Sequence, residues 1–193
     1  MITQLNGRLV SKSPTTIVVD CSGVGYEVHI SLYTYGQLPE DENIRIHTHL
    51  QVREDAHTLY GFMDPLERSV FRLLLSVSGI GANTARTMLS SMNPQEVIQA
   101  IQTDNVAAIQ AVKGIGAKTA QRVLVDLRDK VTQLAGVDEI SIPSNNTQRD
   151  EALSALSVLG YPTKQTQKVI DALLQVEPTM PVERLIKNAL NKL

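Results

Sequence analysis

A thirteen-residue unit occurs twice in this chain, and it constrains the fold more than any other feature. Residues 77–89 read VSGIGANTARTML and residues 112–124 read VKGIGAKTAQRVL, with eight identities at a separation of 35 positions. In each copy an apolar helical run ends at a Gly-Ile-Gly turn, and a second helix begins directly after it. Glycine suits such turns because it adopts backbone conformations that other residues avoid. The sequence therefore predicts two helical hairpins.

The two turns have the chemistry of a phosphate-binding site. The first turn of a helix has unpaired N–H groups and a partial positive charge, and glycines before it leave room for a phosphate. Two such turns would bind the phosphate backbone of a nucleic-acid duplex without reading its bases. Alternatively, the glycines only cap helices while Ile80 and Ile115 fill the core. The candidate DNA-binding residues are Gly79, Gly81, Asn83 and Arg86 in the first copy and Lys113, Gly114, Gly116, Lys118, Thr119 and Arg122 in the second.

The second copy also shares features with a nucleotide-binding P-loop, because residues 114–119 end in Lys-Thr. A P-loop, however, needs a longer glycine-bounded loop with Gly directly before Lys, and a buried strand leads into it. Residues 105–112 have the pattern of a helix instead. The spacing therefore excludes a P-loop.

Composition favours a cytoplasmic protein with two or three small domains. The chain has 193 residues and a single cysteine, Cys21, so it cannot form an internal disulfide. No run approaches the roughly 18 apolar residues of a membrane span, and residues 1–9 lack the pattern of a signal peptide. We therefore expect no membrane contact.

Charge is distributed unevenly along the chain. The formal net charge is −2, which argues against indiscriminate coating of nucleic acid. Residues 64–133 carry 8 basic and 6 acidic side chains, whereas residues 1–63 carry 4 and 7 and residues 134–193 carry 6 and 7. Only the segment that contains the repeat is net positive, which indicates a local footprint on nucleic acid.

The first 63 residues have the alternating pattern of short β-strands, which predicts a five-stranded barrel of the oligonucleotide-binding (OB) kind. Along residues 44–53 one side of the strand is apolar, so the other side is predicted to be a basic, hydrogen-bonding surface. The apolar side has Ile44, Ile46, Leu50 and Val52, and the other has Arg45, His47, His49, Gln51 and Arg53. His47 and His49, with Glu54 and Asp55 nearby, are candidate zinc ligands, but no matching cluster occurs elsewhere, so we expect no metal.

From Asp64 onward the pattern is helical, which makes the predicted fold class α+β and multidomain. Two segments are strong helix-start signals, Asp64-Pro65 and Asn93-Pro94. In each, a glutamate lies two residues after the proline. We expect an all-α domain with tandem hairpins over residues 64–135, a flexible linker over residues 136–148 and a three-helix bundle over residues 149–193. The expected helices are 65–77, 82–91, 94–102, 105–112, 117–133, 151–159, 164–175 and 182–190.

Several short motifs accompany this order of parts. They are GYEVH at residues 25–29, VREDA at residues 52–56, LYGF at residues 59–62 and LSVLGY at residues 156–161. Together with the two hairpins, they resemble the RuvA family, the Holliday-junction-binding subunits of the bacterial branch-migration machine. The resemblance spans the whole chain except the linker.

The resemblance implies a non-catalytic, sequence-independent DNA-binding subunit that acts in recombination, DNA repair and the SOS response to DNA damage. It implies a homotetramer, or an octamer of two tetramers across DNA, that holds a four-way junction open. A hexameric ATPase, RuvB, would then move the duplex arms, and the junction resolvase RuvC would be a further partner. No cofactor is implied.

The resemblance also assigns residue roles. It implies that His29 and Arg53 face DNA, and that Glu54 and Asp55 form an acidic pin at the tetramer centre. From the residues alone, the two acids could equally form a solvated turn. Asn83 stands where the family often has lysine, and Arg86 could replace that contact.

For the C-terminal bundle the resemblance implies a docking site for the motor. Leu156 and Leu159 lie three residues apart and Tyr161 follows Gly160, so the three could form an apolar patch. Alternatively, both leucines belong to the core of the bundle.

Two other classes of function stay open from the residues alone. A DNA glycosylase or nuclease would need a nucleophilic lysine or a carboxylate, for which Lys113, Lys118, Asp126 and Asp129 are candidates. The third class is a structural adaptor whose hairpins no longer bind DNA.

Overall fold

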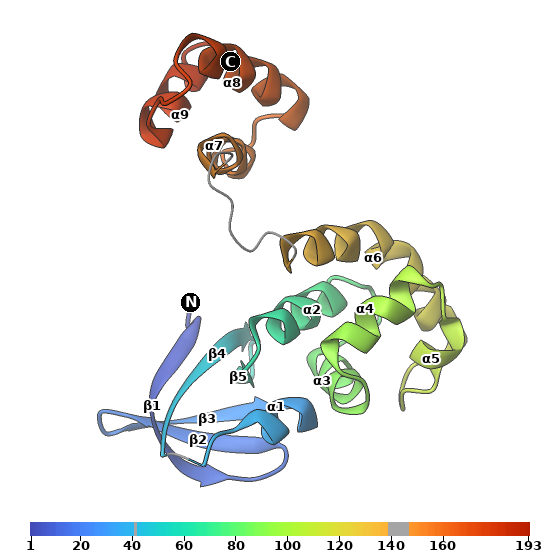
Figure 1. The fold of residues 1–193 in the computed structure, drawn as a ribbon. Helices are drawn as coiled ribbons and strands as arrows, with labels where there is room; N and C mark the ends of the chain where they lie inside the picture. Colours follow the sequence, from blue (N-terminus) through green and yellow to red (C-terminus); the bar gives the residue numbers. More distant parts are fainter. Residues whose placement is uncertain (41, 139–146) are drawn as a thin grey trace. The chain divides into compact units, whose positions relative to one another are not determined.

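The computed structural model describes residues 1–40, 42–138 and 147–193 (Figure 1). The chain forms two compact units, Met1–Val137 and Asp138–Leu193. In the described part of the chain, no helix is long and apolar enough to cross a membrane.

The first unit begins with a closed five-stranded barrel, which confirms the predicted OB-like fold. Neighbouring strands follow the order β1-β2-β3-β5-β4, and all pairs are antiparallel except β3 with β5. The elements are β1 (Gln4–Lys12), β2 (Thr16–Cys21), β3 (Val24–Ile30), α1 (Leu32–Gln37), β4 (Asn43–Val52) and β5 (His57–Phe62).

The interior of the barrel is filled by alternate residues of each strand. Ile44 and Ile46 are buried as the alternation predicted, whereas Val52 at the strand end is 62% exposed. Gly61 also points inward, and a Cβ there would lie 2.6 Å from Val28 and 2.7 Å from Ile46. Any larger residue would therefore displace the core.

The predicted basic surface on the other side of β4 is wrong for His47 and His49, because α2 (Pro65–Leu75) packs on β4 and β5 (Figure 1). The ring of His49 lies 5.5 Å from that of Phe71. Burial is the main cause that lowers the pKa of both histidines, and nearby arginines lower it further. Both rings are therefore biased toward the neutral form.

Aromatic packing joins the barrel to the helices that follow. The rings of Tyr60 and Phe62 lie 5.2 and 4.9 Å from that of Phe71, within a core shared by β5 and the helices. The expected boundary at residue 63 thus marks a change of secondary structure inside one compact unit.

The rest of the first unit is helical, as predicted. Asp64 and Asn93 cap their helices with side-chain hydrogen bonds, and Asn93 forms a capping box with Glu96. Besides α2, the helices are α3 (Ala82–Ser91), α4 (Pro94–Gln102), α5 (Val106–Gln110) and α6 (Ala117–Asp138).

The expected linker, residues 136–148, lies mostly outside the described residues. Its first three residues belong to α6, and Thr147 begins α7. The helical pattern therefore continues beyond residue 133, where we expected α6 to end.

A buried carboxyl group connects α2 with α1. Glu67 is fully buried and accepts hydrogen bonds from the hydroxyls of Ser31 and Thr34, the latter at 2.5 Å. Burial raises the pKa of Glu67 to about 7, although the two hydroxyl bonds oppose this shift. Nothing in the sequence pattern distinguished this glutamate from a first-turn residue that complements the helix dipole.

The second unit is the predicted three-helix bundle. Its helices are α7 (Thr147–Val158), α8 (Thr163–Val176) and α9 (Val182–Leu190). Their core includes Leu156, Ile170 and Leu185, each fully buried. Arg149 on α7 forms an ion pair with Asp171 on α8, with 2.6 Å between Nε and Oδ1.

Candidate nucleic-acid interface

The two Gly-Ile-Gly turns have the same backbone conformation. Gly79 and Gly114 have φ angles of 96° and 92°, in the left-handed region that favours glycine. After each turn, the helix begins with the same bond, from the N–H of the fourth residue to the carbonyl of Gly81 or Gly116, at 2.9 Å. The repeat in sequence is therefore a repeat in structure.

Each turn combines a buried isoleucine with exposed glycines. Ile80 and Ile115 are both 5% exposed, and their N–H groups are each bonded at 3.1 Å to the carbonyl three residues earlier. All four turn glycines are exposed, and a Cβ at Gly81, Gly114 or Gly116 would meet no atom within 4 Å. The isoleucines thus fill the core, while the backbone between them stays open to a ligand.

The second hairpin has two free cationic side chains. Lys113 precedes the turn, Lys118 lies in the first turn of α6, and both are exposed. Neither has an ion-pair or side-chain hydrogen-bond partner within residues 1–40, 42–138 and 147–193. These two ammonium groups and the exposed backbone form one surface suited to phosphate.

Thr119 and Arg122 make contacts toward the first hairpin. A Cβ at Gly79 would lie 3.7 Å from the hydroxyl of Thr119, which is half-buried. Arg122 Nη1 donates a hydrogen bond to the carbonyl oxygen of Ser78 at 3.0 Å. The guanidinium therefore fastens α6 to the first turn, a role that the sequence analysis missed.

Arg86 is likewise bound to the protein. Its Nη1 donates to the carbonyl of Thr15 at 3.2 Å and lies 3.4 Å from Nδ1 of His29. The His29 ring is half-buried, and its centroid lies 5.8 Å from that of Tyr60. Asn83, by contrast, is exposed at the start of α3. The structure thus places Arg86 and His29 between α3 and the barrel.

Arg53, Glu54 and Asp55 lie in the turn between β4 and β5, and all three are exposed. The N–H of Arg53 donates to the carbonyl of Ala56 at 2.9 Å, which closes the turn. Two adjacent carboxylates thus project from one end of the barrel beside a single cation.

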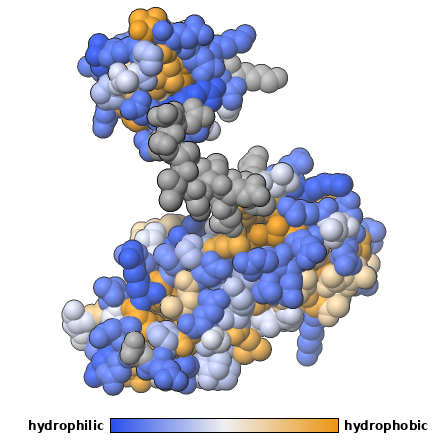
Figure 2. Space-filling view, viewed as in Figure 1, coloured by the Kyte–Doolittle hydropathy of each residue, from blue (hydrophilic) through white to orange (hydrophobic). Residues whose placement is uncertain are grey.

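The residues suggested for motor docking have different environments. Leu156 is fully buried, so its assignment to a surface patch is wrong. It belongs instead to the core of the bundle. Leu159 is 58% exposed, and Tyr161 is half-buried against the core. Val158, which the sequence analysis did not select, is 85% exposed. Apolar residues lie among hydrophilic ones on the surface of this unit (Figure 2).

Two further sets of residues were suggested for zinc binding and for catalysis. His47 and His49 belong to no group of three or more metal-ligating side chains among the residues that the structure describes. Asp126 and Asp129 are exposed on α6.

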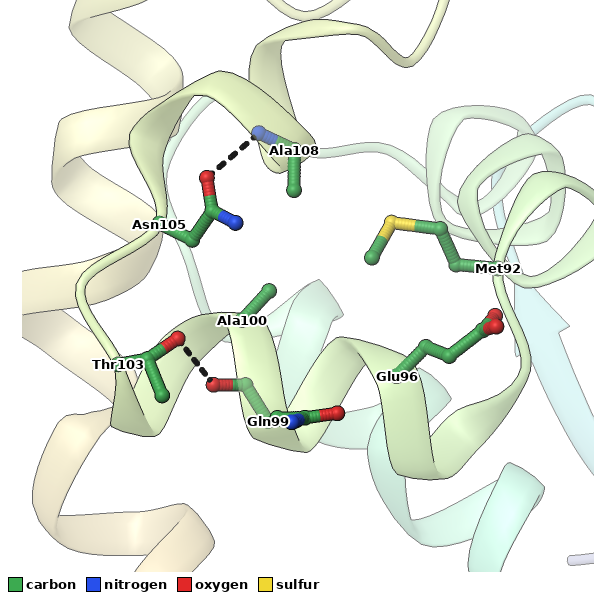
Figure 3. Close-up of a pocket in the computed structure, with 7 residues that line it drawn as sticks. All are labelled: Met92, Glu96, Gln99, Ala100, Thr103, Asn105 and Ala108. Carbon is green, nitrogen blue, oxygen red and sulfur yellow. Dashed lines mark hydrogen bonds between the residues drawn. The ribbon is translucent and has the colours of Figure 1, made fainter.

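A shallow pocket of about 230 Å³ lies between α4 and α5 (Figure 3). Its polar side chains serve the local helix ends: Asn105 accepts from the N–H of Ala108 at 3.1 Å, and Thr103 donates to the carbonyl of Gln99 at 2.8 Å. The pocket therefore offers few free groups to a ligand.

Comparison with known proteins matches nearly the whole chain. Residues 1–61 match the RuvA N-terminal domain, residues 71–129 the SAM-like helix-hairpin-helix tandem, and residues 147–193 the RuvA C-terminal domain. A protein of Christiangramia forsetii is 53% identical over the full length of both chains. The chain belongs to the RuvA family. Full-length RuvA proteins of Flavobacterium psychrophilum and Bacteroides fragilis are 52% and 44% identical, and all three are named Holliday junction branch migration complex subunit RuvA.

Proposed function

We propose that this chain is the DNA-binding subunit of a branch-migration complex and binds four-way junctions. Membership of the RuvA family and the names of the relatives support this proposal. The observation that carries it is the pair of matching hairpins, each with an exposed left-handed glycine turn, within one compact unit.

The hairpins hold phosphates of the junction arms and do not read bases. In the second hairpin, Gly114 and Gly116 expose the backbone, and Lys118 and Lys113 supply positive charge. The first hairpin has Asn83 in place of a lysine, so its contact depends more on the N–H groups of α3. Because phosphates are the same in every sequence, the binding is independent of arm sequence.

Specificity for a junction comes from repulsion at its centre. Four copies in a homotetramer bring their Glu54 and Asp55 pairs together around the axis. These carboxylates repel the phosphates of a continuous duplex within a Debye length of about 8 Å, and they keep the exchanging strands apart. A second tetramer on the opposite face would enclose the junction as an octamer.

The second unit recruits the motor. Leu159, Val158 and Tyr161 provide an exposed or half-exposed apolar surface at the end of α7, suited to contact a partner such as the RuvB ATPase. RuvC would act on the same junction.

A chain that ends at residue 138 keeps the first unit and should bind junctions without stimulating the ATPase, whereas Tyr161→Ala should weaken only recruitment of the motor. Unimpaired branch migration by the shortened chain would refute this division.

We infer that the chain itself performs no chemical step. A glycosylase or nuclease places its lysine or carboxylate in a recess that receives a flipped base or a scissile phosphate. Lys113, Lys118, Asp126 and Asp129 are instead all exposed.

The most direct test of junction binding is a gel shift with a four-way junction and a linear duplex of the same arm sequence, in magnesium-free and magnesium-containing buffer. Preferential binding to the junction, without strand cleavage, is expected. Equal binding to both, or cleavage, would contradict the proposal.

A further inference from the structure

Three arginines and the half-buried ring of His47 gather on one side of the barrel. Arg45 and His47 come from β4, and Arg68 and Arg72 come from α2; we call this group the basic face. The two β4 side chains point outward, because the residues that alternate with them fill the barrel interior. Neither hairpin contributes to this group.

Two arginines of the basic face are held in place but not neutralised. Arg45 Nη2 donates to the side-chain oxygen of Gln4 at 3.1 Å, and Arg68 Nη1 donates to the carbonyl of Thr3 at 2.9 Å. Both acceptors are neutral. None of the four side chains has an ion-pair partner within the described ranges.

The positive charges of the arginines repel one another and disfavour a charge on His47. The pKa of His47 is lowered first by burial and then by Arg68 and Arg45, and the pKa of Arg68 is lowered by burial and by Arg72. A negatively charged partner would relieve this repulsion, so the basic face is better suited to a complex than to an isolated chain.

The opposite side of the barrel carries two acidic residues, of which Asp20 lies opposite Arg8 of β1 in the sheet register and Glu27 lies opposite Val18. In the closed order β1-β2-β3-β5-β4, the neighbours of β4 are β1 and β5, so β2 and β3 lie across the barrel from it. Asp20 on β2 and Glu27 on β3 point outward there. Asp20 Oδ1 accepts from the N–H of Gly23 at 2.7 Å, whereas Glu27 is exposed, with no ion-pair partner in the part of the chain that the structure describes.

Opposite charges on opposite sides of one rigid barrel cannot meet within a single copy, but they meet when two copies pack head to tail. Such a contact generates a ring when the rotation closes. If the basic face bound DNA instead, the exposed Glu27 on the opposite side of the barrel would have no role. A surface suited to phosphate is also already present at the hairpins. We infer that the basic face of one copy binds the acidic side of the next copy, with Glu27 as the principal partner. This inference rests on the proposed homotetramer.

The test is a charge exchange in the full chain. Arg72→Glu and Glu27→Arg each place like charges at the contact, and we expect each to weaken self-association about tenfold or more in sedimentation velocity at low salt. Both residues are exposed, so neither change removes core packing. The double variant restores opposite charges and should recover assembly. Lys113→Glu is the matched control, because it should weaken junction binding and leave assembly unchanged.

Each alternative outcome is distinguishable. If the wild-type chain is monomeric, the homotetramer and this inference both fail. If the wild type assembles and both single variants assemble equally well, or if the double variant does not recover, only this inference fails. If Arg72→Glu keeps its assembly and loses junction binding, the basic face binds nucleic acid and the inference is overturned.

Discussion

The side chain of Arg122 reaches from the helix after the second hairpin to the turn of the first, where its Nη1 donates a hydrogen bond to the carbonyl of Ser78 at 3.0 Å. Thr119, one turn earlier on α6, packs beside Gly79 of the same turn. Arg86 anchors the other side of that hairpin to the barrel through Thr15. The distance between the two Gly-Ile-Gly turns is therefore fixed by side chains before any ligand arrives.

Arg122→Ala should loosen the first hairpin. Hydrogen bonds from a charged donor contribute roughly 1.5–3 kcal/mol, and somewhat less when exposed, so amide exchange at Ile80 should accelerate about tenfold in the free protein. Ile115, in the matching turn, is the internal control and should be unaffected. Equal acceleration at both amides, or none, would show that Arg122 does not position the first turn.

Lys118→Ala should weaken junction binding to a similar extent for all arm sequences. If Lys118 contacts one phosphate, the slope of the logarithm of affinity against the logarithm of salt concentration should decrease in magnitude by about 1 in this variant. Asn83→Lys should have the opposite effect, because it gives the first hairpin the charge found in the second. Asp129→Lys also adds a lysine, but elsewhere on α6, and is the control for Asn83→Lys. A salt slope that stays the same in Lys118→Ala would place this side chain away from DNA.

Replacing the two turn acids should reduce the preference for junctions. Glu54→Gln with Asp55→Asn would remove the proposed repulsion at the junction centre, so affinity for linear duplex should rise more than affinity for the junction. Competition titrations at one salt concentration measure both. Unaltered discrimination would favour the alternative that the acids only form a solvated turn.

Glu67→Gln should change how stability depends on pH. The pKa of Glu67 is raised from the ordinary 4.5 to about 7 in the folded state. The stability that its protonated form provides is therefore complete below about pH 4.5 and is lost as pH rises through about 7. One pKa unit corresponds to about 1.4 kcal/mol, so the free energy of unfolding of the variant relative to wild type should rise by about 3 kcal/mol across that range. Urea unfolding at several pH values measures this difference. Asp129→Asn, at an exposed acid, should give no such trend, and a pH-independent difference for Glu67→Gln would show that the buried carboxyl does not titrate there.

Much of the fold was predictable from local pattern. The two hairpins could be located because Gly79 and Gly114 need left-handed backbone angles, and the barrel because its strands alternate with a period of two. The start of α4 follows from the strong signal Asn93-Pro94, and α3 begins directly after Gly81 of the repeat. These features depend on residues close together in the chain.

The errors arose where distant segments meet. Alternation correctly placed His47 and His49 outside the barrel, but it could not show that α2 covers them. The aromatic pair Tyr60 and Phe62, followed by Phe71, was the available signal. The contact between Arg122 and Ser78 joins residues 44 positions apart and left no local pattern. Burial of Leu156 was one of two alternatives that helical spacing could not separate.

The proposed function requires that the two matching hairpins bind the backbone of a four-way junction as a pair. The most direct measurement is the dissociation constant of the full chain for a four-way junction and for linear duplex, each with two unrelated arm sequences, at one salt concentration. The junction should bind at least about tenfold more tightly than the duplex, which is about 1.4 kcal/mol, with no dependence on arm sequence. Equal affinity for duplex and junction, or affinity that follows arm sequence, would contradict it.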